Sequence, residues 1–107
     1  MEITSLKLKE KIKNGDKVII DFHAKWCGPC RTMKPTFEKV AEQLKKENSL
    51  VELYTMDVEE NRDIAIEYGV RAIPTIKVFN GGLVSESKSG VLMESEIKKL
   101  VTDLING

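Results

Sequence analysis

Cys27 and Cys30 are the only cysteines of the 107-residue chain, and both lie in the segment WCGPC, residues 26–30. Two thiols separated by two residues can bind a metal, form a structural disulfide or exchange electrons as a dithiol–disulfide pair. A structural zinc site needs four ligands, and His23 is the only further soft or borderline ligand. A carboxylate could complete such a set, but no second cysteine pair exists. The redox pair is therefore favoured, and we expect no metal.

The composition excludes several other classes of protein. Lysine plus arginine and aspartate plus glutamate number 17 each, so the chain lacks the basic excess of a nucleic-acid-binding surface. The basic segment at residues 7–13 is interrupted by apolar residues and is typical of a solvated helix face. No apolar run is long enough to span a membrane, and no secretory signal is evident. These features predict a single cytoplasmic domain over residues 1–107, in which a structural disulfide would be unusual.

The hydrophobic pattern predicts an α/β fold in which strands and helices alternate. Helices are expected at residues 4–14, capped by Thr4 or Ser5 and stopped by Gly15, from the cysteine segment to about residue 48, at 61–68 with Asn61 as the cap, and after Gly90. Strands are expected at residues 17–24, 51–58, 75–80 and 83–88, the last two joined by a Gly81–Gly82 turn. The last helix has an apolar stripe that should face the core, formed by Met93, Ile97, Leu100, Val101 and Leu104.

The position of the cysteines is more informative than their spacing. Cys27 lies where the strand ends and the next helix begins, so the free amides of the first turn should stabilise its thiolate and lower its pKa. Pro29 suits the first turn, where its missing N–H would have had no partner. Cys30 follows one turn later and can attack a sulfur already bonded to Cys27. The pair is predicted to act as a nucleophile with its own resolving thiol.

Asp21 lies inside the apolar run VIIDFHA, residues 18–24. A buried carboxylate is costly, so Asp21 should have either a partner or a raised pKa. The pattern alone leaves a structural and a functional interpretation equally open.

The segment WCGPC, the strand before it and Ile73-Pro74-Thr75 together resemble the thioredoxin family. The resemblance extends over nearly the whole chain: the segments DFHAKWCGPC, YGVRAIPT and FNGG, with Pro35 and Gly90, occur in the family's order and spacing. It implies the thioredoxin fold, a central mixed sheet of four to five strands flanked by four helices. Only about 26 residues precede Cys27, so the family's first edge strand should be reduced to residues 1–3 or absent.

The resemblance also implies a function, a thiol–disulfide oxidoreductase that reduces disulfides in substrate proteins. Cys27 would attack the substrate disulfide, and Cys30 would resolve the mixed disulfide. Electrons would come from NADPH through a thioredoxin reductase, with no bound cofactor, in a cytoplasmic monomer that serves electron transport and cell redox homeostasis. Gly28-Pro29 between the cysteines is typical of the strongly reducing members of this fold. The alternative is an interaction module that holds a partner on the same apolar surface without turnover.

The family pattern assigns roles to further residues. Asp21 would exchange a proton with Cys30, and Pro74 would follow a cis peptide bond and pack against the cysteines. Ile73 would offer its backbone to an extended substrate segment. The substrate-binding surface would comprise Trp26, Gly28, Pro29, Ile73, Pro74, Gly90 and Val91. Trp26 would also shield the nucleophile, and the alternative is an ordinary half-buried tryptophan.

Two positions near the cysteines depart from the family pattern and are candidate modulators. His23 stands where the family commonly has tryptophan; it is either a structural residue or a pH-dependent influence on Cys27 or on docking. Thr55 stands where many members have a lysine beside the aspartate. Loss of that cation should leave Asp21 more easily protonated than in members that keep the lysine. A conservative change, Arg31 for lysine after the second cysteine, keeps the charge.

Overall fold

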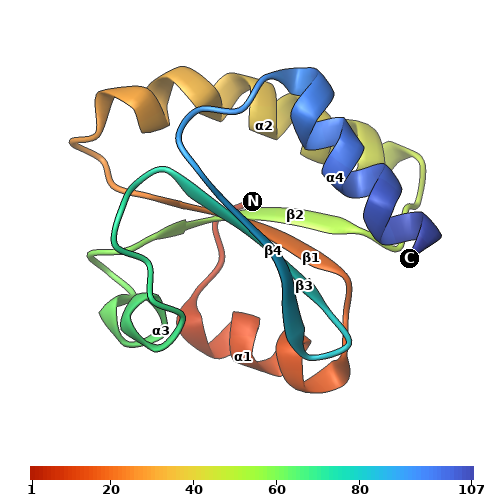
Figure 1. Ribbon diagram of the computed structural model, residues 1–107, viewed down its shortest axis with the longest axis horizontal. Helices are drawn as coiled ribbons and strands as arrows, with labels where there is room; N and C mark the ends of the chain where they lie inside the picture. The colour runs from red at the N-terminus through yellow and green to blue at the C-terminus, as the bar shows by residue number, and fades with distance from the viewer.

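The computed structural model describes residues 1–107, which form four helices and four strands (Figure 1). Their order is α1 (Ser5–Asn14), β1 (Val18–His23), α2 (Gly28–Lys46), β2 (Glu52–Asp57), α3 (Arg62–Glu67), β3 (Thr75–Asn80), β4 (Leu83–Ser89) and α4 (Glu94–Asn106). Every helix and strand expected from the sequence is present. None of these helices has the length and apolar character needed to cross a membrane.

The strands form one mixed sheet in the order β2-β1-β3-β4. Strand β1 runs parallel to β2 and antiparallel to β3, and β3 pairs antiparallel with β4 across the Gly81–Gly82 turn. Figure 1 shows α2 and α4 on one face of the sheet and α1 and α3 on the other. The expected α/β architecture is therefore confirmed.

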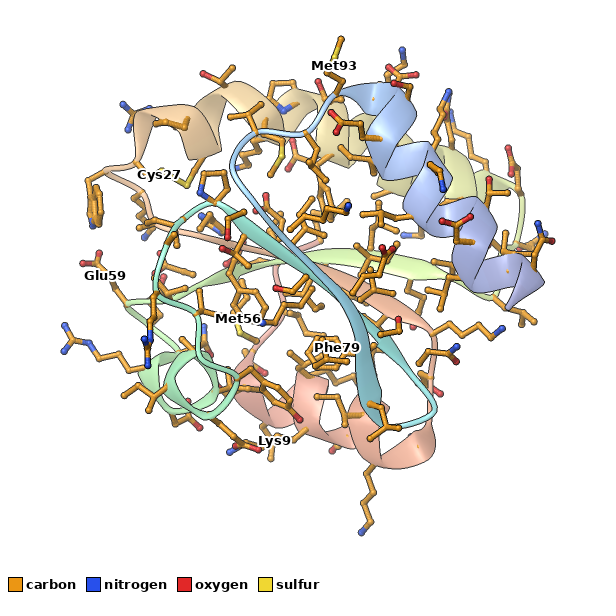
Figure 2. The ribbon with its side chains drawn as sticks, in the orientation of Figure 1. Lys9, Cys27, Met56, Glu59, Phe79 and Met93 are labelled. Atoms are coloured by element: carbon orange, nitrogen blue, oxygen red, sulfur yellow. A yellow bond between two sulfur atoms is a disulfide. The ribbon has the colours of Figure 1, made fainter.

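Strand β1 is the centre of the fold because it is covered on both faces. Ile19 belongs to the apolar core beneath α2 and α4, whereas Ile20 and Phe22 belong to the core beneath α1 and α3. Phe79 of β3 also lies in the core beneath α1 and α3, on the α1 side of the sheet (Figure 2). Its ring packs edge to face with the Tyr68 ring, and the two ring centroids are 5.1 Å apart. Burial on both faces explains why the sequence of β1 is a continuous apolar run rather than an alternating one. Because side chains alternate along a strand, Asp21 faces the α2 side, as Ile19 does.

The N-terminal segment makes only one bridge to the sheet, between Glu2 and Thr55 of β2. The Ile3 N–H donates to the Thr55 carbonyl at 2.8 Å, and the Thr55 N–H donates to the Met1 carbonyl at 3.0 Å. Residues 1–3 thus occupy the place of an edge strand without forming one, as the sequence predicted. The Ile3 side chain is buried in the α1-side core, so Glu2, its neighbour in an extended segment, faces the α2 side.

Two expectations about single side chains were wrong. Met93 was expected in the core but is 70% exposed and points outward at the start of α4 (Figure 2), because the buried stripe begins only at Ile97. Asn61 occupies the N-cap position of α3 but does not cap it with its side chain. Its Oδ1 instead accepts from the Ser5 N–H at 2.8 Å, which joins α3 to the start of α1.

Strand β4 is an edge strand with little burial, and six of its seven residues are exposed. Its register against β3 shifts between Val78 and Phe79, which pair with Glu86 and Val84, so that Ser85 has no partner of its own. Such a shift is a β-bulge, which bends and twists the strand.

Gly15 ends α1 in the left-handed conformation, with φ of 76°. Its N–H donates to the Ile12 carbonyl and the Asp16 N–H to the Lys11 carbonyl, both at 3.0 Å, the hydrogen-bond pattern of a Schellman motif. An added Cβ would find ordinary space, with its nearest neighbour at 3.7 Å. We therefore expect Gly15→Ala to lower the free energy of unfolding by about 1 kcal/mol through backbone strain alone. Urea unfolding measures this, and an unchanged midpoint would contradict it.

Candidate active site

The two cysteines lie at the junction between β1 and α2. Cys27 is the N-cap of α2, and its Sγ accepts the Cys30 N–H at 3.2 Å. Pro29 lies in the first turn, as expected. Cys27 and Cys30 are joined as a disulfide, and each residue is only 3% exposed. Figure 2 shows the Cys27 sulfur beneath the first turn of α2. A hydrogen bond from the helix start to Sγ favours the thiolate over the thiol.

A loop before β3 lies against the cysteines. The Ile73–Pro74 peptide bond is cis, as the resemblance implied. Ile73 packs on the cluster of Ala24, Cys27 and Cys30, with its carbonyl oxygen 3.9 Å from Cys27 Sγ. The Gly90 N–H donates to the Pro74 carbonyl at 2.8 Å, which ties the end of β4 to this loop.

Apolar side chains are exposed around this loop and the helix start. Trp26 is 65% exposed and Val91 is 47% exposed, whereas Gly28 and Pro29 form the exposed first turn of α2. The structure therefore brings the expected surface residues to the same end of the molecule as the cysteines. Trp26 is more exposed than a half-buried structural tryptophan would be.

The Asp21 side chain is buried, only 1% exposed, and its Oδ1 has no hydrogen-bond partner among the protein atoms. Burial raises the pKa of Asp21 from 3.8 to about 6, a shift that the Glu2 carboxylate adds to and His23 opposes. The sequence left open a partner or a raised pKa, and burial without a partner for Oδ1 favours the raised pKa. A cavity of about 150 Å³ is lined by both Asp21 and Cys30, so a small molecule such as water could connect them.

The walls of this cavity contain both candidate modulators. Thr55 lies directly opposite Asp21 in the parallel register of β1 and β2, and His23 lies two residues beyond Asp21 on the same face. The remaining lining residues are Ala24, Lys25, Arg31 and Lys34. His23 and Thr55 thus line the same cavity as Asp21, for which the resemblance implies proton exchange with Cys30.

Glu2 is the site residue that sequence reasoning missed. Its carboxylate accepts hydrogen bonds from the Thr55 hydroxyl and, at 2.9 Å, from the Asp57 N–H, and it lies 3.1 Å from His23 Nε2. A signal was present: in the short edge segment expected at residues 1–3, the alternation of strand side chains puts Glu2 on the face opposite to Ile3. No group of three or more His, Cys, Asp and Glu side chains is arranged to hold a metal ion.

The family model described as Thioredoxin matches residues 1–103. The chain belongs to the thioredoxin family. A thioredoxin of Mycoplasmoides gallisepticum is 36% identical over 95 residues, which cover 89% of this chain and 91% of that protein. A thioredoxin of Porphyra purpurea is 33% identical over 106 residues, or 98% of this chain and 96% of that protein. Similar proteins thus match along nearly the entire chain.

Solved structures of the thioredoxin family agree with this assignment. A mutant thioredoxin from Halobacterium salinarum superimposes with a TM-score of 0.83 at 32% identity, covering 97% of this chain and 88% of that one. With the Cys27–Cys30 pair at the active-site position of the thioredoxin family, the protein is a thiol–disulfide oxidoreductase of the protein-disulfide reductase type.

Proposed function

We propose that this thioredoxin-family protein reduces substrate proteins with Cys27 as the nucleophile, Cys30 as the resolving thiol and Asp21 as the proton acceptor. One observation carries the proposal: the buried Asp21 carboxyl and Cys30, one member of the disulfide-bonded pair, line the same cavity at the start of α2. The proposed domain comprises residues 1–107, acting as a monomer in the cytoplasm.

The first step is attack by the Cys27 thiolate on a substrate disulfide. One substrate sulfur becomes bonded to Cys27, and the other leaves with the electron pair as a thiolate. The bond from the Cys30 N–H to Cys27 Sγ supports this role, since it stabilises negative charge on Cys27. The substrate segment would extend along Ile73 and Pro74, and Trp26, Gly28, Pro29, Gly90 and Val91 would contact it.

The second step releases the reduced substrate. Cys30 gives its proton to the Asp21 carboxylate through the cavity, and the resulting thiolate attacks Cys27 Sγ. The Cys27–Cys30 disulfide forms while the substrate sulfur leaves with the electron pair. A pKa of about 6 suits Asp21 to this step, because the group is mostly ionised at neutral pH yet is a stronger base than an ordinary carboxylate.

Two partners complete the proposed cycle. A thioredoxin reductase would return the disulfide to the dithiol with electrons from NADPH, and the protein itself would need no bound cofactor. Disulfide-containing proteins would be the substrates. Peroxiredoxins are one candidate class, because a matching structure (TM-score 0.82, 31% identity) concerns thiol resolution in a yeast mitochondrial 1-Cys peroxiredoxin via glutathione/thioredoxin systems.

A coupled assay tests this proposal against the alternative of a binding module. Purified protein, a bacterial thioredoxin reductase and NADPH are mixed with insulin, and NADPH oxidation is followed at 340 nm. We expect catalytic turnover, because the reductase would regenerate the dithiol after each cycle. Stoichiometric binding of a disulfide protein without NADPH oxidation would favour the module. The control is the same protein with dithiothreitol in place of the reductase. If the protein reduces insulin with dithiothreitol but not with the reductase, it uses a different electron donor.

A further inference from the structure

Four polar side chains gather on the α2 side of the sheet, at the end where α2 begins. Asp21 and His23 come from β1, Thr55 comes from β2, and Glu2 comes from the segment bridged to Thr55. The four are brought together by pairing between segments that are far apart in the sequence. Glu2 is the member with the most contacts to the others.

The Glu2 carboxylate is an acceptor for three groups. Oε1 accepts the Thr55 hydroxyl and lies 3.1 Å from His23 Nε2, and Oε2 accepts the Asp57 N–H at 2.9 Å and lies 3.2 Å from the same His23 nitrogen. The His23 side chain is 14% exposed, whereas that of Glu2 is 52% exposed. The more exposed Glu2 carboxylate therefore lies between solvent and the nearly buried His23 ring and holds that ring in place.

The hydrogen bond from the Thr55 hydroxyl to Glu2 affects which groups can bond to Asp21. A threonine hydroxyl has one hydrogen to donate, and here it goes to Glu2. Thr55 lies directly opposite Asp21 and lines the same cavity, yet Asp21 Oδ1 has no hydrogen-bond partner. The hydroxyl of the residue paired with Asp21 thus donates its hydrogen to Glu2 and not to the buried carboxyl.

Charged groups surround Asp21 on several elements. His23 lies on its own strand, Glu2 on the bridged segment and Asp57 at the end of β2. Lys25, in the turn before α2, and Arg31, Lys34 and the Cys30 sulfur on α2 line the cavity. Glu2 is the group whose charge adds to burial in raising the pKa of Asp21, and His23 opposes it.

We propose that Glu2 is a positioning residue for proton transfer at Asp21. It draws the Thr55 hydroxyl away from Asp21 and holds His23 at the cavity wall, which leaves an Asp21 oxygen free to take the proton of Cys30. The proposal rests on the role of Asp21 proposed above. In the resolution step the S–H bond of Cys30 breaks, its proton goes to the Asp21 oxygen, and its electron pair forms the bond to Cys27. The bond between Cys27 and the substrate sulfur breaks at the same time, and the substrate sulfur leaves with the electron pair as a thiolate.

The test compares Glu2→Gln, which is isosteric and neutral, with Glu10→Gln, which neutralises an exposed carboxylate on α1. The ¹³C resonance of the Asp21 carboxyl is titrated in the reduced protein, and the rate of insulin reduction is measured from about pH 5 to about pH 9. We expect Glu2→Gln to move the Asp21 midpoint and the acid limb of the rate profile down by about 0.5 to 1 pH unit. Glu10→Gln should move neither, and an unchanged Asp21 midpoint in Glu2→Gln would overturn the proposal.

Two further sets of variants separate the possible failures. Thr55→Val should leave the Asp21 midpoint unchanged in the parent protein but raise it in Glu2→Ala, where the freed hydroxyl can turn to Asp21. Additive effects of Glu2→Ala and Thr55→Val would overturn the positioning argument. If Asp21→Asn does not alter the acid limb, the proposed role of Asp21 fails, and the role of Glu2 fails with it. If Asp21→Asn alters the limb but Glu2→Gln does not, only the role of Glu2 fails.

Discussion

Replacement of Cys30 by serine should convert the protein from a catalyst into a covalent trap for its substrates. Cys27 would still be the N-cap of α2, beside the amide of residue 30, so the first attack on a substrate disulfide remains available. A serine hydroxyl is a poor nucleophile at neutral pH, so the mixed disulfide would not be resolved. We expect turnover in the coupled assay to fall by more than about 1000-fold.

The matched control is Cys27→Ser, which removes the first nucleophile and should abolish both turnover and adduct formation. Intact-mass measurement after incubation with oxidised insulin distinguishes the two variants. Cys30→Ser should gain the mass of one whole insulin molecule, because its two chains stay joined by their second interchain disulfide, and dithiothreitol should remove this mass. An adduct on Cys27→Ser but not on Cys30→Ser would show that the order of the two cysteines is reversed, and turnover by either variant would contradict the two-thiol mechanism.

The second large effect concerns Asp21→Asn, which should make the oxidised protein more stable and its reduced form a slower catalyst. Because burial raises the pKa of Asp21 from 3.8 to about 6, the folded protein retains a proton that the unfolded chain loses between these pH values. The free energy of unfolding therefore falls as the pH rises through this window. An ionised Asp21 destabilises the fold by about 2 to 3 kcal/mol at pH 7, and an uncharged asparagine does not.

Urea unfolding of the oxidised protein at pH 7 and pH 4 measures the stability effect. Asp21→Asn should raise the free energy of unfolding by about 2 to 3 kcal/mol at pH 7 and by little at pH 4, where the parent carboxyl is protonated when folded. For catalysis, loss of the proton acceptor should slow resolution of the mixed disulfide about 100-fold near pH 7. Equal stability of the two proteins at pH 7 would contradict the raised pKa, whereas unchanged resolution would contradict the role in proton transfer.

The elements around the cysteines were predictable because their signals are local. The apolar run of β1 and the spaced apolar face of α2 depend on neighbouring residues, and Gly15 marks the end of α1 directly. Asp21 was identified as a buried acid for the same reason, since a single carboxylate stands out in an apolar strand. Its pKa direction followed from burial, which the sequence already indicated.

The features that were not predicted depend on contacts between distant segments. Asn61 is a residue type that often caps a helix, but its side-chain oxygen accepts a hydrogen bond from the Ser5 N–H instead. Met93 fits the helical spacing of α4, yet it precedes the first buried turn. Glu2 is an ordinary charged residue until the bridge to Thr55 places it beside His23. The alternation of side chains in residues 1–3 indicates which face Glu2 occupies, but no pattern in the sequence identifies Thr55 and His23 as its partners.

The exposed strand β4 has a consequence for behaviour at high concentration. An edge strand presents unpaired backbone groups that can recruit the edge of another molecule and begin aggregation. The β-bulge at Ser85 interrupts the regular spacing of those groups, and Glu86 and Lys88 place charges of both signs along the strand. A second molecule that paired with this edge would have to bury those charges. No helix or further strand covers the β4 edge, so the bulge and the charges of β4 itself discourage the formation of a sheet between molecules.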